Sequence, residues 1–167
     1  MEGSTPSAPR WTFSLASPPS IALCIIAREC GPDLARCLAS AAPYVQQIII
    51  IDNCPTRDHS IERVARKFGA ELHYFRACND ELGRIASFAQ MRNESLQYIK
   101  TDWWMWLDSD DELRNGARLQ EILEDVPADI TRFSFPYDYA RDEFGNCVAL
   151  HDRERLMRTS AEWRWEG

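Results

Sequence analysis

The chain has 167 residues, of which 45% are hydrophobic and 27% are charged, which is typical of one globular domain and excludes disordered and fibrous proteins. Its formal net charge of -7 argues against general affinity for nucleic acid or anionic membranes, because no excess of Lys and Arg can neutralise phosphates. A single phosphorylated ligand needs only a local pocket and stays compatible with this charge.

The cysteines and the apolar runs indicate in which cellular compartment the protein resides. The six cysteines contain no C-x-x-C pair, so we expect free thiols rather than a zinc site or a disulfide scaffold. No apolar run has the length of a membrane span, and the N-terminus lacks a signal-peptide pattern. These features predict a cytoplasmic protein without a transmembrane segment.

Strands and helices are predicted to alternate after a Ser- and Pro-rich leader over residues 1–20. Short apolar runs predict buried strands over residues 21–27, 48–51, 71–75 and 103–107. Helical periodicity predicts a helix opening at Gly31-Pro32-Asp33, one capped by Ser60 and closed by Gly69, one over 85–99 and one over 119–126. The alternation predicts an α/β fold for residues 21–167, with a mostly parallel sheet and helices on both faces.

The pattern changes after Asp129. Residues 130–139 and 147–150, with a turn at Phe144-Gly145-Asn146 between them, predict a β-hairpin. Residues 153–158 are predicted as a further strand of this region.

An acidic cluster follows the strand over residues 103–107. Asp108, Asp110, Asp111 and Glu112 repel one another, which favours a cation or a polycationic partner at this edge of the sheet, where α/β proteins bind ligands. The spacing excludes a calcium loop, whereas Asp-Ser-Asp can hold a divalent ion by one or two carboxylates and leave positions for phosphates. The alternative is a solvated turn that caps the next helix, and we expect Asp111 or Glu112 to contribute a cap.

Polar residues also follow two other strands. Arg28-Glu29 ends the first strand and Asp52-Asn53 ends the second. The carboxyl ends of parallel strands share one edge, so these groups can meet the acidic cluster. The alternative is that strands end in polar residues simply because loops begin there.

Four blocks occur in order: IALCIIAREC, IIIIDNCPTRD, FAQMRNESL and DWWMWLDSDDEL. Together they resemble the nucleotide-sugar half of family 2 glycosyltransferases, which have the GT-A fold, and YDYARDEFGN and EWRWEG resemble members with a hairpin after the metal motif. One departure is the segment CPTRD after Asp52, where the family usually has a Ser/Thr-Gly-rich turn.

The resemblance implies a nucleoside-diphosphate sugar donor, with a UDP-sugar favoured, and Mn²⁺ or Mg²⁺ as cofactor. Asp110 would bind the ion, and Asp108 would contact it or the ribose. The implied substrate-binding residues are Ala27, Arg28, Glu29, Asp52, Arg92, Asp108 and Ser109. Arg92 would lie near the diphosphate; its alternative is an exposed helix arginine paired with Glu94 or Asp80.

The resemblance also implies inverting transfer, which needs a general base for the acceptor hydroxyl. That base is expected beyond Gly167, so we expect a domain that is truncated at its C-terminus, with Trp163 and Trp165 exposed. Within the chain the candidate carboxylates are Asp138, Asp142, Asp152, Glu154, Glu162 and Glu166. The acceptor stays unidentified.

Two other functions are consistent with an acidic metal site on such a sheet. One is a module that binds nucleotide and metal without turnover. The other is a sugar-nucleotide pyrophosphorylase, although Ala27-Arg28-Glu29-Cys30 does not supply the glycine-rich loop that such enzymes use for a triphosphate.

Overall fold

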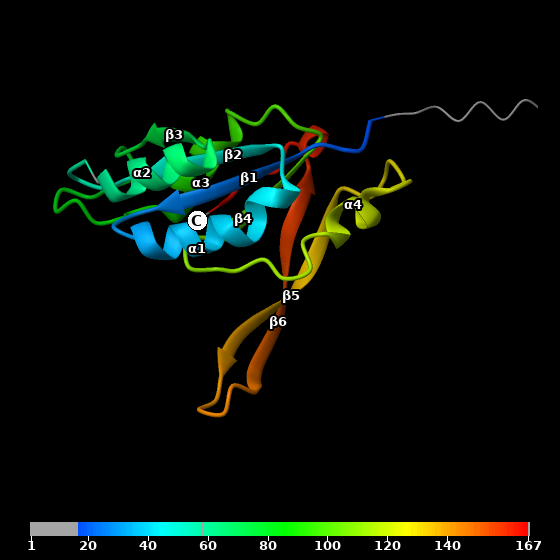
Figure 1. Cartoon of the computed structure of the whole chain (residues 1–167). Helices are drawn as coiled ribbons and strands as arrows, with labels where there is room; N and C mark the ends of the chain where they lie inside the picture. Colours follow the sequence, from blue (N-terminus) through cyan, green and yellow to red (C-terminus); the bar gives the residue numbers. More distant parts are fainter. Residues whose placement is uncertain (1–16, 58, 167) are drawn as a thin grey trace, which may run out of the picture.

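The computed structural model describes residues 17–57 and 59–166, which form one six-stranded sheet in the order β3-β2-β1-β4-β6-β5 (Figure 1). Strands β1 to β4 run parallel, and β6 and β5 continue the sheet antiparallel. The strands are β1 Ile21–Ala27, β2 Gln47–Asp52, β3 Glu71–Tyr74, β4 Trp103–Asp108, β5 Arg132–Arg141 and β6 Cys147–Arg158. The prediction of a mostly parallel α/β sheet is confirmed.

In the described part of the chain, four helices cover the two faces of this sheet. They are α1 Gly31–Ala41, α2 His59–Phe68, α3 Phe88–Leu96 and α4 Arg118–Leu123, with short 3-10 turns η1 Ala42–Tyr44 and η2 Thr159–Ala161. The apolar sides of α1, α2 and α4 contribute to one core cluster, whereas α3 contributes to the other. Helices on both faces were predicted and are present. Over the described residues, none of the helices is long and apolar enough to cross a membrane.

Four predicted helix starts or ends are wrong, and one of them is the end of the helix predicted over 85–99, which lies at Leu96. The helix predicted over 85–99 begins at Phe88, because the Ser87 hydroxyl accepts the Gln90 N–H as an N-cap, while Ile85 pairs with Asn79 in an isolated bridge. Ser60 lies within α2 instead of capping it. The last helix ends at Leu123, before the predicted 126.

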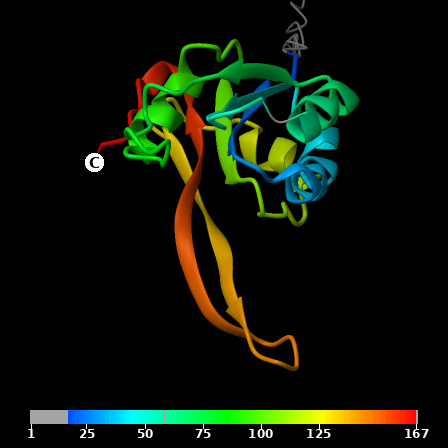
Figure 2. The ribbon, with the colours of Figure 1, turned by 90° about the vertical axis from the view of Figure 1, so that its left-hand side faces the viewer.

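The hairpin is present, but its strand bounds differ from the prediction: the first strand, predicted over 130–139, is Arg132–Arg141. Residues 153–158 are not a separate strand but the second half of β6, which pairs with β5 along most of its length. The end of β6 also pairs with β4, with Met157 opposite Trp104 and Leu156 opposite Met105. The outer half of the hairpin projects away from the body of the domain (Figures 1 and 2).

The end of the predicted leader is bound to the domain. The Ser20 N–H and hydroxyl both donate to Asp102 Oδ2, at 2.8 and 2.7 Å, and Gln120 donates to the Pro19 carbonyl. The prediction of a loose leader is therefore wrong for these two residues. Residues 1–16 lie outside the described part of the chain.

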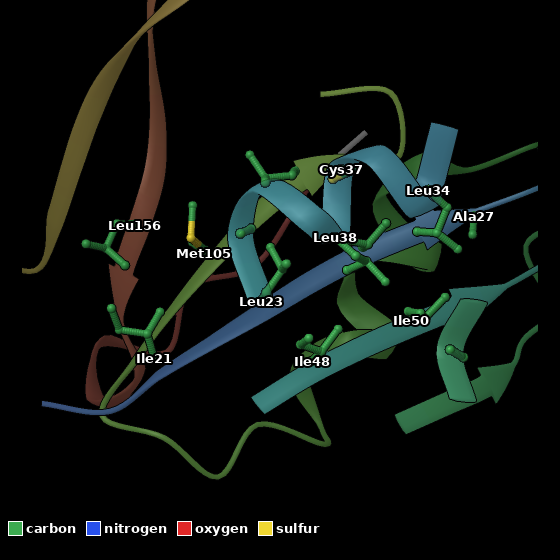
Figure 3. Packing of buried hydrophobic residues seen from close by; sticks show 14 of the residues in the cluster. Ile21, Leu23, Ala27, Leu34, Cys37, Leu38, Ile48, Ile50, Met105 and Leu156 are labelled. Carbon is green, nitrogen blue, oxygen red and sulfur yellow. The ribbon is translucent and has the colours of Figure 1, made fainter. Parts of the chain in front are cut away.

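Side-chain alternation along the central strands divides the core into two clusters. Ile21, Leu23, Ile25 and Ala27 of β1 face the helices α1 and α2, as Figure 3 shows for three of them. The residues between them face α3. Each central strand is thus buried on both faces, which explains why its sequence is apolar at nearly every position.

The two C-terminal tryptophans join the second cluster. Trp163 and Trp165 are partly buried against the α3 side of the sheet, and the Trp165 ring meets Trp106 edge-on at 4.9 Å between centroids. The Trp165 backbone N–H donates to Asn93 Oδ1, and its carbonyl accepts from the same amide. The expectation that these tryptophans are exposed is wrong.

Leu38 of α1 is fully buried in the first cluster, which makes it a sensitive test of the core. Leu38→Ala should lower the free energy of unfolding by about 2–5 kcal/mol, because it removes buried methyl groups and leaves a cavity. Chemical denaturation measures this change. Leu82→Ala is the control, since Leu82 is 76% exposed and its truncation should change stability little. Equal losses for the two variants would contradict the assigned core.

Candidate active site at the carboxyl edge of the sheet

The three polar strand ends lie side by side. In the strand register Ala27 of β1 is opposite Asp52 of β2, and Ile26 is opposite Asp108 of β4. The loops that follow β1, β2 and β4 therefore begin at one edge of the sheet. The structure brings the predicted groups together on adjacent strands, as the parallel order requires.

Arg92 connects α3 to the acidic cluster. Its Nη2 donates to Asp108 Oδ1 at 2.8 Å, and its guanidinium lies 4.4 Å from the Trp106 ring and 4.7 Å from the Trp165 ring. Stacking on two indoles holds a long side chain in one orientation and adds a cation–π attraction. Arg92 is therefore a fixed positive charge beside the end of β4.

The alternative partners of Arg92 are excluded. Glu94 accepts the Tyr98 hydroxyl, and Asp80 pairs with Arg84. The hypothesis of an exposed helix arginine paired with Glu94 or Asp80 is wrong.

Arg155 of β6 meets the cluster from the other side. Its Nη2 lies 3.0 Å from Asp111 Oδ2, its Nη1 donates to the Trp106 carbonyl, and its guanidinium lies 3.8 Å from the Trp106 ring. Burial lowers the pKa of Arg155, and nearby Asp111 opposes this by favouring the charged form. Burial and a hydrogen bond with Asp111 raise the pKa of Tyr137. Asp111 is thus a buried carboxylate with its own cation.

A third arginine serves Glu112. Arg36 of α1 places Nε 2.7 Å from Glu112 Oε1, and its Nη2 donates to the Asp110 carbonyl at 3.4 Å. Within the part of the chain that the structure describes, Asp110 is the member of the cluster whose carboxylate has no cation partner. Its exposed carboxylate is therefore the one available to a metal ion.

The capping interpretation of the cluster is wrong. The next helix, α4, begins only at Arg118, and its N-cap residue Ala117 makes no side-chain cap. Asp111 instead closes a turn: its N–H donates to the Asp108 carbonyl, and its Oδ2 accepts the Asp108 N–H at 2.9 Å. The expectation that Asp111 or Glu112 would cap a helix fails because neither lies at a helix start.

Asp52 lies at the end of β2 and is fully buried. Its Oδ1 accepts the Cys54 N–H at 2.8 Å, whereas its Oδ2 is buried and has no hydrogen-bond partner. A buried carboxylate oxygen without a donor is unfavourable, so it is a group that a ligand donor could complete.

The loop after β1 is strained next to Asp52. Glu29 has a φ of 50°, which non-glycine residues rarely adopt, and its N–H donates to Cys54 Sγ at 3.4 Å. Such conformations concentrate at functional sites. Arg28 precedes it and is half-buried, and Ser109 is half-buried in the turn after Asp108.

The donor set fits an ion that is shared with a substrate. In residues 17–57 and 59–166 there is no group of three or more His, Cys, Asp or Glu side chains that could hold a metal. Mg²⁺ in phosphate-transfer sites commonly uses one or two carboxylates and takes its other ligands from phosphates and water. The unpartnered Asp110 and the half-buried Asp108 supply such a pair.

A hollow of about 720 Å³ opens beside Asp110, between the segment 110–119 and strand β5. Its floor is apolar, from Met105, Leu107 and Ile122. Of the six candidate base carboxylates, all within the described residues, Asp138 is the one that lines this hollow. Hydrogen bonds from Cys147 and Arg141 hold the pKa of Asp138 below its ordinary value, which makes it a weak proton acceptor.

Sequence comparison identifies the family. The profile of glycosyl transferase family 2 matches residues 22–158, which is most of the chain. The chain belongs to glycosyl transferase family 2. The carboxyl edge described above carries residues from all four sequence blocks: Ala27, Asp52, Arg92 and Asp108.

Two relatives show how much of a family 2 protein is present. A TPR repeat-containing protein from Synechococcus elongatus is 32% identical over 101 residues, which are 60% of this chain and 23% of that protein. The crystal structure of residues 1–349 of TarS from S. aureus superposes with a TM-score of 0.52 at 12% identity, over 84% of this chain and 47% of TarS. The expected GT-A fold is confirmed, and the chain spans less than half the length of either relative.

A lower similarity is found with mannosyl-3-phosphoglycerate synthase from Rubrobacter xylanophilus. Its TM-score is 0.48 at 17% identity, over 64% of this chain and 37% of that enzyme.

The buried, unpartnered oxygen of Asp52 generates a stability prediction. Asp52→Asn removes a buried negative charge and keeps an oxygen that can accept the Cys54 N–H, so the free energy of unfolding should be equal to or above that of the wild type at neutral pH. Chemical denaturation without ligand measures it. Asp102→Asn is the control, because Asp102 accepts two bonds from Ser20 and should lose stability on neutralisation. A clear loss for Asp52→Asn would show that the carboxylate stabilises the fold.

Proposed function

We propose that this glycosyl transferase family 2 domain binds a nucleoside-diphosphate sugar, with a UDP-sugar favoured, and transfers the sugar to an acceptor hydroxyl with inversion, in the cytoplasm. The observation that carries the proposal is the unpartnered carboxylate of Asp110, at the edge of the sheet where α/β proteins bind ligands. Among the described residues, each of its neighbours in the cluster has an arginine, so Asp110 is the carboxylate best placed to contact an ion directly, with Asp108 beside it.

Asp110, with Asp108, would hold Mn²⁺ or Mg²⁺. When bound, such an ion supplies positive charge to the diphosphate that leaves with the nucleoside. Arg92 is a cation and cannot coordinate the ion, and the Asp111 carboxylate is already paired with Arg155.

The donor's nucleoside would lie toward β1 and β2. Asp52 Oδ2 would accept a hydrogen bond from the base or ribose, because it is buried and lacks a donor. Ala27, Arg28 and Glu29 at the end of β1, and Ser109 after β4, would contribute further contacts to the donor. Arg92 would then face the diphosphate, since charge-assisted bonds from guanidinium to phosphate are strong.

The acceptor would enter through the hollow beside Asp110. The hollow lies on the hairpin side of the cluster, so an acceptor there approaches Asp110 from the side away from β2. Asp138 is already paired with Arg141 and is a poor base for the acceptor hydroxyl.

The free thiols of Cys24, Cys37, Cys78 and Cys147 favour the reducing cytoplasm as the location of the protein.

Sugar release from UDP-, GDP- and dTDP-sugars, with and without Mn²⁺, tests this function. We expect release from a diphosphate sugar only when the ion is present, and tighter Mn²⁺-dependent binding of UDP than of the other two diphosphates. Activity that requires a nucleoside triphosphate would indicate a pyrophosphorylase. Binding without any release would indicate a non-catalytic module.

Calorimetric binding of UDP to Asp110→Asn, with and without Mn²⁺, tests the ion position. This variant should lose the Mn²⁺-dependent part of nucleoside-diphosphate binding while its unfolding curve stays that of the wild type, because Asp110 is exposed and has no cation partner among the described residues. Glu112→Gln is the matched control, since Glu112 is a nearby acid that pairs with Arg36 and should keep metal-dependent binding. Unchanged calorimetric binding by Asp110→Asn would overturn the metal assignment.

The role of Asp52 can be separated from that of the ion. Asp52→Ala should weaken binding of UDP with Mn²⁺ by roughly tenfold or more, the loss expected for one charged hydrogen bond, yet leave binding of inorganic diphosphate with Mn²⁺ unchanged. Calorimetry with the two ligands measures both affinities. Equal losses for UDP and diphosphate would show that Asp52 only supports the loop.

A further inference from the structure

Arg155 is a charged residue that is almost completely buried. Its side chain is 4% exposed and that of its partner Asp111 is 7% exposed. It contacts the Trp106 carbonyl and ring in addition to Asp111, and its guanidinium also lies 4.8 Å from the Tyr137 ring. The contact with Asp111 is an ion pair and not a hydrogen bond, because Arg155 Nη2 has no hydrogen-bond partner among the described residues. Removing either charge would leave the other buried and uncompensated.

The contacts of Asp111 explain what this pair holds. Asp111 Oδ2 accepts the Asp108 N–H at 2.9 Å, and the Asp111 N–H donates to the Asp108 carbonyl at 3.0 Å. These two bonds close a turn whose middle residues are Ser109 and Asp110. The orientation of the Asp110 backbone therefore depends on where Asp111 is held.

We propose that Arg155 is a positioning residue of the transfer site: by clamping Asp111 it fixes the turn 108–111 and so directs the Asp110 carboxylate toward the ion. This inference rests on the proposed function. Groups that orient a metal ligand without touching the metal commonly change metal affinity by about 10- to 100-fold when they are removed. Arg155 acts in this way through Asp111.

An arginine suits this position better than a lysine. The planar guanidinium meets a carboxylate, a carbonyl and two aromatic rings at once, whereas an ammonium is a single strongly hydrated point charge. The conservative variant Arg155→Lys should therefore recover only part of the function. A purely structural arginine predicts a different result, namely that any variant which folds binds the ion and nucleotide normally.

The test uses a variant that removes both charges. Arg155→Met alone would leave Asp111 buried without a cation and lower stability, so the decisive variant is the double Arg155→Met, Asp111→Ala, in which no buried charge is uncompensated. Mn²⁺-dependent UDP affinity is measured by calorimetry well below the unfolding temperature. Amide hydrogen exchange of residues 108–112 is measured without metal or nucleotide.

We expect the double variant to bind UDP with Mn²⁺ about 10- to 100-fold more weakly. In Arg155→Met, which keeps Asp111 as the acceptor of the Asp108 N–H, the amides of Asp108 and Asp111 should exchange faster than in the wild type. Arg155→Lys should be intermediate. Because Arg155 acts through Asp111, the double variant should lose no more affinity than Arg155→Met alone.

Arg158→Gln is the matched control. Arg158 lies on the same strand and stacks on Trp103, but it donates to the carbonyls of Pro127 and Ile130 and contacts none of the cluster carboxylates. Arg158→Gln should change the free energy of unfolding without changing the UDP affinity of the folded protein.

Wild-type affinity in the double variant would overturn the inference and leave the proposed function intact. An affinity loss of the same size in Arg158→Gln would also overturn it, since a structural arginine would then suffice. A wild-type protein that binds no nucleoside diphosphate with Mn²⁺ would overturn the proposed function and the inference with it.

Discussion

Charge repulsion at the end of β4 is the constraint on which this edge of the domain depends. Four carboxylates occur within five residues, and three of them are neutralised by arginines from three different elements: Arg36 of α1, Arg92 of α3 and Arg155 of β6. The packing of these elements around β4 therefore also sets the electrostatics of the site. The arginines neutralise most of the cluster and leave one negative position exposed, so the local charge selects a small cation over a large basic partner.

The central strands were predictable because a strand that is buried on both faces is apolar at nearly every position. An unbroken apolar run such as residues 103–107 has few interpretations, and the strand β1 has the predicted bounds. Helix starts were less predictable, because they depend on single side chains. Ile85 fits the apolar stripe of α3, yet the helix begins three residues later at Phe88, after the Ser87 cap, and Ile85 pairs with Asn79 instead.

Part of the site could be predicted and part could not. Asp52, Arg92 and Asp108 lie in sequence blocks that resemble a known family, and strand order brings them to one edge. Arg155 carries no such signal, since its contact with Asp111 exists only because β6 returns antiparallel beside β4. A pattern read along the chain cannot show which arginine of a distant strand a carboxylate meets. For the same reason the contact of Arg36 with Glu112 could not be predicted, since the sequence of its helix shows only an amphipathic stripe.

The strand order also has a consequence for how the protein is made. In the sheet, β4 lies between β1 and β6. During synthesis β1 emerges from the ribosome before β4, whereas β6 emerges after it. During synthesis the apolar β4 therefore has one edge without a neighbour, and Asp111 has no counterion, until the second half of the hairpin leaves the exit tunnel. Pairing over such sequence separations is slow, so the nascent domain passes through a stage in which this edge is open to wrong partners. The long hairpin is thus the last part of the sheet to form and the part that protects it from aggregation.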